Sequence, residues 1–450
     1  MNDALVIGAG LAGLGAALAL ESAGLDVQVL EAQRRVGGRI HSMRQLGSLA
    51  EAGGTYIGAG YRRVIDAAAR HGVPLIDVTP LLEFFREQDL VLDGELIRQR
   101  DWATHPANPF PLRDRALLPW NYHRVLTVRD NPLGRPEEWL ERRHAALDVP
   151  FHDWLRAQGA TDRAAEVGYG LNPSFGRDAR DVSALLLLFR GAFSKVQREQ
   201  ASADSIGFTV RGGVQRIPEA MRAALRREIA LARPVEAIEA RPDRVVARCA
   251  GGERFEARRA VCAVPIGALR RIAIDPPLPP EQAAAVAEVP SHAITQVYLA
   301  PKSRFWEQDG YAPSLYTDTA AGMVAAARNG EDPNEVTSFT AWAMGRRAEE
   351  LDRLPPAEAG RAVIAAIERV RPAAAGQLEL IGVTSWGNDP HARGAWAYFR
   401  PGQVTRFAAR LGEPHGTVFF AGEHLAVAAR GMEAALESAD RAVAALLASL

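Results

Sequence analysis

A glycine pattern near the start of the chain constrains the fold more than any other feature of the sequence. Gly8, Gly10 and Gly13 follow a short apolar run in the spacing G-x-G-x-x-G. The apolar run predicts a buried parallel strand, and the small and apolar residues over 12–23 predict a helix that starts at the glycines. A second apolar strand is expected over 26–30. This order predicts a β-α-β unit whose helix N-terminus binds the phosphates of a dinucleotide.

Each position in this unit has its own physical reason. Gly8 permits a tight turn, Gly10 lets the backbone approach a diphosphate, and Gly13 lets the helix pack closely against the strand. Ala12 lies at the start of the helix, and Glu31, which ends the second strand, can accept hydrogen bonds from ribose hydroxyl groups. Because this carboxylate would repel a 2′-phosphate, the motif disfavours NADP, but it does not distinguish FAD from NAD.

The size and charge of the chain limit the remaining classes of protein. Its 450 residues exceed what one hydrophobic core usually serves, so two domains are expected. Lys and Arg number 53 against 54 Asp and Glu, and this balance disfavours a nucleic acid or an acidic membrane surface as partner. Cys249 and Cys262 lie in strand-like segments and are expected to be buried and reduced. No histidine or cysteine spacing indicates a metal site.

No segment of the sequence predicts a membrane span or a secretion signal. The first strand begins near residue 3, which leaves no room for a signal peptide. The longest apolar segment, residues 182–193, is shorter than the ~20 residues of a membrane-spanning helix and contains Arg190. We therefore expect a buried helix there, no membrane partner and a cytoplasmic location.

Further segments along the chain carry glycine pairs or short apolar strands. They are residues 32–40, 51–58, 212–218, 233–238, 261–265, 419–424 and 431–435. In this order they resemble the FAD-binding segments of the flavin-containing amine oxidases, a family that includes monoamine oxidases, polyamine oxidases and L-amino-acid oxidases. The resemblance covers most of the FAD-binding segments of that family and little of residues 85–200. A generic dinucleotide-binding protein would account only for the first motif.

The resemblance implies an α/β fold in which a Rossmann-type FAD-binding domain is interleaved with an α+β substrate-binding domain. The FAD-binding domain would comprise residues 1–80, 205–275 and 385–450, and the substrate-binding domain residues 81–204 and 276–384. The last helix would direct the positive end of its dipole toward the flavin. The positions expected to contact FAD are Gly8, Gly10, Ala12, Gly13, Glu31, Ala32, Gly38, Arg39, Gly53, Gly54, Thr55, Val235, Trp386, Gly422, Glu423, Gly431 and Met432.

Aromatic residues are the candidates for the substrate side of the flavin. By the resemblance, Trp396 matches one wall of the family's aromatic cage, whereas Gly431 stands where monoamine oxidases carry a tyrosine. Two alternatives follow: the two-walled cage is incomplete, or Trp342 or Tyr398 supplies the second wall. Such a pocket favours the neutral amine, whose lone pair the reaction needs, and stacks against the substrate. Ala395 replaces the cysteine that bonds to FAD in some monoamine oxidases, so the resemblance implies non-covalent FAD.

Gln296 is the most informative departure from the family pattern. Most members carry a lysine at this position, which holds a water at flavin N5 and is linked to reactivity with oxygen. Glutamine is polar enough to hold a water, but it supplies no positive charge to a forming superoxide. We therefore expect slow turnover with oxygen, and a dehydrogenase that uses another electron acceptor is an open alternative. Lys302, six residues further on, is expected to be solvated.

The substrate is less constrained than the cofactor. L-amino-acid oxidases bind the substrate carboxylate with an arginine, and this chain has Ile57 at the matching position, which disfavours an α-amino acid. Asn172 lies in the expected substrate region, where it either binds the substrate or caps the turn before Pro173. No acidic cluster predicts a polyamine. A hydrophobic or aromatic amine is the expected substrate.

The expected reaction is the FAD-dependent oxidation of a C–N bond of this amine, with hydride transfer to flavin N5 and hydrolysis of the resulting imine. O2 or another electron acceptor would then reoxidise the flavin. Two alternatives stay open: an FAD-dependent enzyme that oxidises C–C bonds, similar to carotenoid desaturases or protoporphyrinogen oxidase, and a flavoprotein without catalytic activity. A homodimer is the default expectation for the assembly.

Overall fold

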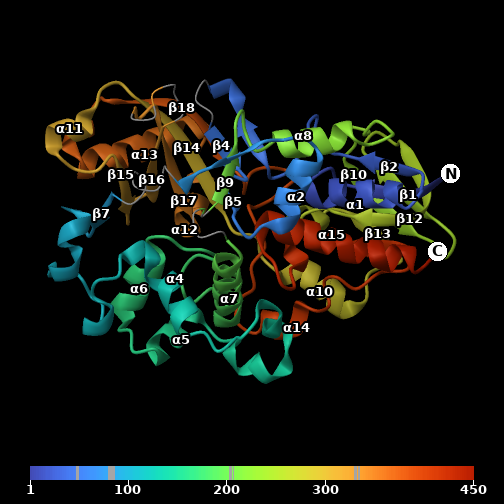
Figure 1. Ribbon diagram of the computed structural model, residues 1–450, viewed down its shortest axis with the longest axis horizontal. Helices are drawn as coiled ribbons and strands as arrows, with labels where there is room; N and C mark the ends of the chain where they lie inside the picture. Colours follow the sequence, from blue (N-terminus) through green and yellow to red (C-terminus); the bar gives the residue numbers. More distant parts are fainter. Residues whose placement is uncertain (47–49, 80–86, 202–204, 206, 329–331, 333–334) are drawn as a thin grey trace.

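Two large sheets and a group of helices make up the computed structural model of the protein (Figure 1). The structure describes residues 1–46, 50–79, 87–201, 205, 207–328, 332 and 335–450. The first sheet takes its strands from both ends and from the middle of the chain. The two halves of the molecule are therefore connected several times.

The first sheet contains the predicted β-α-β unit. Its strands are β1 (Asn2–Ile7), β2 (Val27–Leu30), β10 (Val235–Ala240), β11 (Val245–Cys249), β12 (Arg254–Cys262), β13 (Ala273–Asp275) and β19 (Val418–Phe420). They lie in the order β13-β10-β11-β12-β1-β2, and β19 pairs with the end of β12. β1 is parallel to both of its neighbours and its last four residues are buried, as expected for a strand that is covered on both faces. The two strands predicted at the start of the chain are thus confirmed.

Two helices from opposite ends of the sequence pack against each other beside this sheet. They are α1 (Leu11–Ser22) and α15 (Gly431–Leu447), the blue and red helices at the right of Figure 1. A Cβ atom at Gly15 would lie 2.7 Å from Cδ2 of Leu436, so the glycine permits the close approach of the two helices. The helix predicted over 12–23 and the last helix are both confirmed. α1 begins directly after Gly10 of the glycine-rich turn, and α15 begins at Gly431, which lines the cavity described below.

The second sheet lies at the other end of the molecule and is mainly antiparallel. Its strands are β7 (Gln88–Leu92), β8 (Glu95–Ile97), β14 (Ile294–Pro301), β15 (Ser314–Thr317), β16 (Met323–Ala327), β17 (Ser338–Met344) and β18 (Leu378–Ser385). They lie in the order β18-β14-β17-β16-β15-β7-β8, and only the β15–β7 pair is parallel among the described strands. α13 (Pro356–Val370) buries Val363 and Ile367 in the core of this sheet, together with Val297 and Phe339.

A group of helices packs below the second sheet in Figure 1. They are α4 (Pro119–Arg129), α5 (Phe151–Ala157), α6 (Asp162–Gly170) and α7 (Ala184–Gln200). Most of the apolar segment 182–193 lies in the first part of α7 and is buried, which confirms the prediction of a buried helix. Over the described part of the chain, no helix has the length and apolar character that a membrane span requires.

Shorter elements complete the fold. The strands are β3 (His41–Met43), β4 (Ala50–Gly53), β5 (Ile57–Gly58), β6 (Leu75–Asp77) and β9 (Gly207–Val210), and the helices are α2 (Arg62–Arg70), α8 (Arg216–Ala223), α9 (Ile266–Leu269), α10 (Pro280–Glu288), α11 (Phe305–Asp309), α12 (Arg346–Leu351) and α14 (Gln403–Phe407). Cys249 and Cys262 are free and buried, as predicted. The domain boundaries stay a prediction, and the boundary residues 80, 81 and 204 lie outside the described part.

Candidate functional site

One cavity of about 650 Å³ lies where the two sheets meet. The loop after β1, the end of β2, the segment 233–236 and the start of α15 line it from the side of the first sheet. Ile294 of β14 and Trp342 of β17 line it from the second sheet. A single cavity therefore joins the dinucleotide motif to the candidate substrate residues.

Most positions predicted to contact FAD line this cavity. They are Gly8, Gly10, Ala12, Glu31, Ala32, Gly38, Arg39, Gly53, Gly54, Thr55, Val235, Trp386, Gly422, Glu423, Gly431 and Met432. Gly13 is the exception. Of the residues predicted to act on the substrate, Trp342 and Trp396 line the cavity, whereas Gln296, Asn172 and Tyr398 do not.

The three glycines of the first motif differ in what surrounds them. Gly8 has a φ of +103°, which favours glycine, and carries the chain from β1 into the turn. No protein atom lies within 4 Å of a Cβ atom placed on Gly10, which faces the cavity, so the free N–H groups of α1 border open space there. A Cβ atom on Gly13 would overlap the carbonyl oxygen of Gly8. The loop therefore leaves room for a diphosphate at Gly10 and has no spare room at Gly13.

Glu31 holds the glycine-rich loop in place. Its Oε2 accepts a hydrogen bond from the backbone N–H of Ala9 at 2.6 Å, and its Oε1 accepts one from Gln33 at 2.8 Å. Burial raises the pKa of Glu31, and these two N–H groups act against that rise. Each carboxylate oxygen has a second lone pair, so Glu31 keeps the capacity to accept hydrogen bonds from a ribose.

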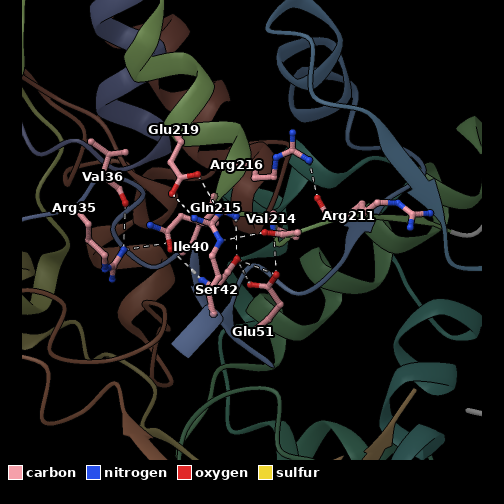
Figure 2. Close-up of polar contacts among 12 residues, drawn as sticks. Arg35, Val36, Ile40, Ser42, Glu51, Arg211, Val214, Gln215, Arg216 and Glu219 are labelled. Atoms are coloured by element: carbon pink, nitrogen blue, oxygen red, sulfur yellow. Dashed lines mark hydrogen bonds and ion pairs between the residues drawn. The ribbon is translucent and has the colours of Figure 1, made fainter. Parts of the chain in front are cut away.

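A polar cluster fixes the segment that contains Gly53 and Gly54, and Figure 2 shows the side chains of this cluster. Ser42 Oγ donates to Glu51 Oε2 at 2.8 Å, and the backbone N–H of Val214 donates to Glu51 Oε1 at 2.9 Å. Gln215 Oε1 accepts a hydrogen bond from the backbone N–H of Ser42 at 3.1 Å. A Cβ atom on Gly213 would overlap Ser42 Oγ, so the turn before α8 needs this glycine. The cluster anchors β4, which leads directly into the cavity-lining residues Gly53 and Gly54.

An ion pair ties three distant segments together at the cavity wall. Arg39 Nη1 donates to Glu423 Oε1 at 2.8 Å and to the carbonyl oxygen of Ala395 at 2.8 Å. The same Glu423 oxygen accepts a hydrogen bond from the backbone N–H of Ala397 at 3.0 Å. The side chains of Arg39 and Glu423 are only 22% and 12% exposed, so the pair is largely shielded from solvent. The segment around residue 396 is therefore held by a contact that joins both ends of the chain.

Tryptophan side chains form the other part of the cavity wall. Trp386 Nε1 donates to the carbonyl oxygen of Ala52 at 2.8 Å, and Trp396 Nε1 donates to that of Ser174 at 3.1 Å. These bonds fix the indole rings and leave their faces to pack. The ring of His292 stacks on Trp396 with centroids 5.4 Å apart, and burial lowers the pKa of His292 to about 3. The imidazole is therefore neutral and adds no charge beside Trp396.

The remaining predicted substrate residues lie behind the cavity wall. Gln296 is fully buried in β14, and its Nε2 donates to the carbonyl oxygen of Glu51 at 3.1 Å. Asn172 Nδ2 makes a long contact of 3.4 Å with the carbonyl oxygen of Trp120. Tyr398 donates to Asp181 Oδ2 at 2.8 Å, so its hydroxyl is directed into an ion-pair network. Direct substrate contact by these three residues has no support in the cavity lining and stays a prediction.

Several cavity-lining residues were not among the predicted positions. They include Tyr61, Arg233, Val264, Pro265, Arg271 and His391. Val264 and Pro265 belong to the segment 261–265, which resembles an FAD-binding segment of the family, so the sequence does carry a signal for them. Tyr61 and Arg271 carry no local signal, because their position depends on how separate segments pack.

The glycine-rich loop, the acid at the end of β2 and a cavity between the two large sheets are typical of enzymes that bind a dinucleotide cofactor. The family model described as flavin containing amine oxidoreductase matches residues 11–447. The chain therefore belongs to the flavin-containing amine oxidoreductases. The predicted family resemblance is confirmed.

Individual relatives agree with this assignment. A flavin-containing amine oxidase of Danio rerio is 27% identical over 98% of this chain and 84% of its own length. The structure of wild-type putrescine oxidase bound to putrescine is 25% identical, covers 99% of each chain and has a TM-score of 0.77. Cyclohexylamine oxidase from Brevibacterium oxydans IH-35A shares the fold, with a TM-score of 0.79 over 100% of this chain and 99% of its own at 24% identity.

The protein is thus a flavin-dependent amine oxidoreductase with FAD as its cofactor, and the predicted α/β fold is confirmed. The family favours oxidation of an amine over the alternatives of C–C oxidation or a flavoprotein without activity. The cavity fits such a cofactor, because its open space at Gly10 and its long glycine-lined wall leave room for a diphosphate and a flat ring system.

Proposed function

We propose that the protein oxidises the C–N bond of an amine with an apolar or aromatic body, which binds beside Trp342 and Trp396. The observation that supports this most directly is that both indole rings line the same cavity as the predicted FAD-binding residues. Gly431 adds no side chain to this wall, so the second aromatic surface is assigned to Trp342. FAD, when bound, supplies the acceptor for the hydride from the carbon next to nitrogen.

The residues of the chain have two tasks in this reaction. Gly10 and the N-terminus of α1 would hold the diphosphate, and Gly53, Gly54 and Trp386 would lie against the ring system. The wall around Trp396 keeps the amine neutral, because an apolar surrounding lowers the pKa of an ammonium group and the adjacent His292 is itself uncharged. The neutral amine keeps the lone pair that the oxidation requires.

Anaerobic titration of the purified holoenzyme with primary, secondary and cyclic amines tests this proposal. We expect loss of the flavin absorbance near ~450 nm with at least one amine that has an aromatic or cyclic body. The matching alcohols, which have the same apolar body but no amine nitrogen, are the control and should leave the spectrum unchanged. A flavin that no amine reduces would contradict the proposal and favour a role without amine oxidation.

We further propose that oxygen reoxidises the enzyme slowly because Gln296 is neutral. Its Nε2 is bound to Glu51, and its buried Oε1 has no hydrogen-bond partner among the described residues, which suits an acceptor for an ordered water. Gln296→Lys is expected to raise the second-order rate of reoxidation by O2 by about 10-fold or more, because the cation would stabilise a forming superoxide. Stopped-flow mixing of the reduced enzyme with oxygen measures this rate.

Gln296→Met is the matched control for that experiment. It has a similar size and no charge, so its reoxidation rate should stay near that of the unmodified protein. Equal rates for the lysine and methionine variants would show that charge at this position does not limit the reaction with oxygen.

Two further features belong to the same proposal. FAD is bound without a covalent link, since Ala395 lines the cavity and neither cysteine of the chain does. A homodimer and a cytoplasmic location stay predictions from the sequence.

A further inference from the structure

Three arginines lie close together next to the flavin cavity. Arg124 and Arg430 both act electrostatically on Arg190, and the guanidinium of Arg430 lies 5.8 Å from the ring of Phe189, the neighbour of Arg190 in the sequence. Arg124 belongs to α4, Arg190 to α7, and Arg430 is the residue before the first turn of α15. α4 and α7 approach each other closely, because a Cβ atom on Gly191 would overlap the carbonyl oxygen of Thr127. We name these three residues the arginine cluster.

The arginine cluster has no carboxylate partner within the part of the chain that the structure describes. Arg190 makes no hydrogen bond or ion pair there, and Arg124 Nε and Arg430 Nη1 are buried without a hydrogen-bond partner. Glu423 is the acid that acts on Arg430 electrostatically, but it is already bound by Arg39 at 2.8 Å. Unpaired charges inside a protein are costly, so such a cluster indicates a missing anion.

The surroundings of the arginine cluster oppose its positive charge, and no neighbouring tyrosine compensates for that charge. Burial, and then the neighbouring Arg124 and Arg430, lower the pKa of Arg190, and burial lowers the pKa of Arg430 to about 10, which still leaves it charged at neutral pH. Burial raises the pKa of Tyr61 and Tyr169, so these phenols stay neutral and offer no compensating charge. Arginine retains its proton in proteins because of its high intrinsic pKa.

The arginine cluster is not completely covered by other side chains. All three residues keep an intermediate exposed area, although burial lowers the pKa of each. Each guanidinium therefore keeps some uncovered surface and can still donate hydrogen bonds to an anion.

Contacts on two sides link the arginine cluster to the flavin cavity. On one side, Arg430 adjoins Gly431, which lines the cavity together with Tyr61, and the ring of Tyr61 lies 5.9 Å from that of Phe193 in α7. On the other side, the guanidinium of Arg430 lies 4.3 Å above the ring of Phe175. Phe175 follows Ser174, whose carbonyl oxygen fixes the cavity-lining Trp396. The cluster therefore adjoins the wall at which the amine is proposed to bind.

We propose that Arg124, Arg190 and Arg430 form an anion-binding subsite that receives the carboxylate of an amine substrate. The substrate is then an amine that also bears a carboxylate, with its apolar body against Trp396. Guanidinium groups suit this ligand because they donate paired hydrogen bonds to a carboxylate. Ile57, where an arginine of L-amino-acid oxidases is expected, contributes no charge, so the anion would be bound from a different set of helices. This inference rests on the proposed amine oxidation.

Matched substrates test the subsite in the holoenzyme. Anaerobic stopped-flow reduction of the flavin is measured with phenylalanine, its methyl ester and 2-phenylethylamine, and with 4-aminobutyrate and butylamine. We expect at least one carboxylated amine to exceed its uncharged counterpart in the ratio of reduction rate to Kd by about 100-fold. No preference for the carboxylate in either series would overturn the inference.

Variants and a binding measurement separate this inference from the proposed function. Arg190→Gln and Arg430→Gln should each reduce the carboxylate preference at least about 10-fold, mainly through Kd, and Arg190→Lys should retain most of it. Arg361→Gln, at an exposed position of α13, is the control and should leave the preference unchanged. A preference that persists in both glutamine variants would also overturn the inference.

Phenylacetate and benzoate, which cannot be oxidised as amines, report on the subsite directly. Each should perturb the flavin spectrum saturably in the unmodified holoenzyme and about 10-fold more weakly in Arg190→Gln. If these acids bind in this way but no amine reduces the flavin, the subsite stands and the proposed function fails. If simple amines reduce the flavin but the acids do not bind, the proposed function stands and the subsite fails.

Discussion

Gly13→Ala is expected to yield a protein that is purified without FAD and is destabilised by more than about 4 kcal/mol. The added methyl group would overlap the carbonyl oxygen of Gly8 and lie 3.3 Å from Cγ1 of Val6. Both neighbours belong to β1 or to the turn after it, so α1 would have to move away from the sheet. That movement would open the turn that is predicted to hold the diphosphate.

Gly10→Ala adds the same methyl group at a cavity-lining position where the protein itself has room. Gly10 has a φ of −74° and no protein atom within 4 Å of the added carbon. We expect the free energy of unfolding of this apoprotein to lie within about 1 kcal/mol of that of the unmodified apoprotein, because alanine adopts this conformation without strain. FAD affinity should nevertheless fall by at least about 10-fold, since the methyl group occupies the space left for the diphosphate.

Two measurements on the same samples distinguish these effects. The visible spectrum and released flavin give the FAD content, and urea unfolding of each apoprotein gives the free energy of unfolding. Gly13→Ala should lower both the FAD content and the free energy of unfolding, whereas Gly10→Ala should lower the FAD content alone. If Gly13→Ala retained normal stability and FAD, tight helix–strand packing at this position would not be required.

Glu423→Gln is expected to lower the free energy of unfolding by about 2–4 kcal/mol near neutral pH. The substitution leaves the largely shielded guanidinium of Arg39 without its 2.8 Å ionic partner. It also weakens the bond that holds the backbone of Ala397 and thereby the cavity segment around Trp396. FAD retention should fall as well, because the three joined segments all line the cavity.

The effect of Glu423→Gln should depend on pH in a defined direction. Burial alone would raise the pKa of Glu423, but Arg39, His424 and the N–H of Ala397 outweigh it, so the pKa lies below the ordinary 4.5. A carboxylate with a depressed pKa stabilises the fold above its unfolded pKa and loses this contribution as pH falls through its folded pKa. The stability difference should therefore be constant from about pH 6 to 8 and shrink below about pH 4.5.

Urea unfolding across this pH range measures the difference. Glu413→Gln, which removes the partner of Arg410 in an exposed ion pair, is the matched control and should cost less than about 1 kcal/mol. A difference for Glu423→Gln that grows at acidic pH would contradict the assigned direction of the pKa shift.

Local features of the sequence determined the β-α-β unit of this protein and the positions that are predicted to bind the dinucleotide. The spacing of Gly8, Gly10 and Gly13 fixes a turn, and the acid at position 31 ends the next strand, within a segment of only about thirty residues. Such signals can be recognised without the fold because the backbone conformation and the ligand geometry are set by neighbours in sequence. The positions predicted from the family's glycine segments accordingly line one cavity, apart from Gly13, which packs inside the unit.

Only the tertiary structure decided which aromatic and charged groups meet at the cavity. Trp396 and Tyr398 are two residues apart, yet Trp396 lines the cavity and Tyr398 donates to Asp181. The arginine cluster joins residues 124, 190 and 430, which no sequence spacing relates. Their meeting depends on how α4, α7 and α15 pack, and packing of distant segments is a property of the whole core, whereas the glycine turn is a property of a few adjacent residues.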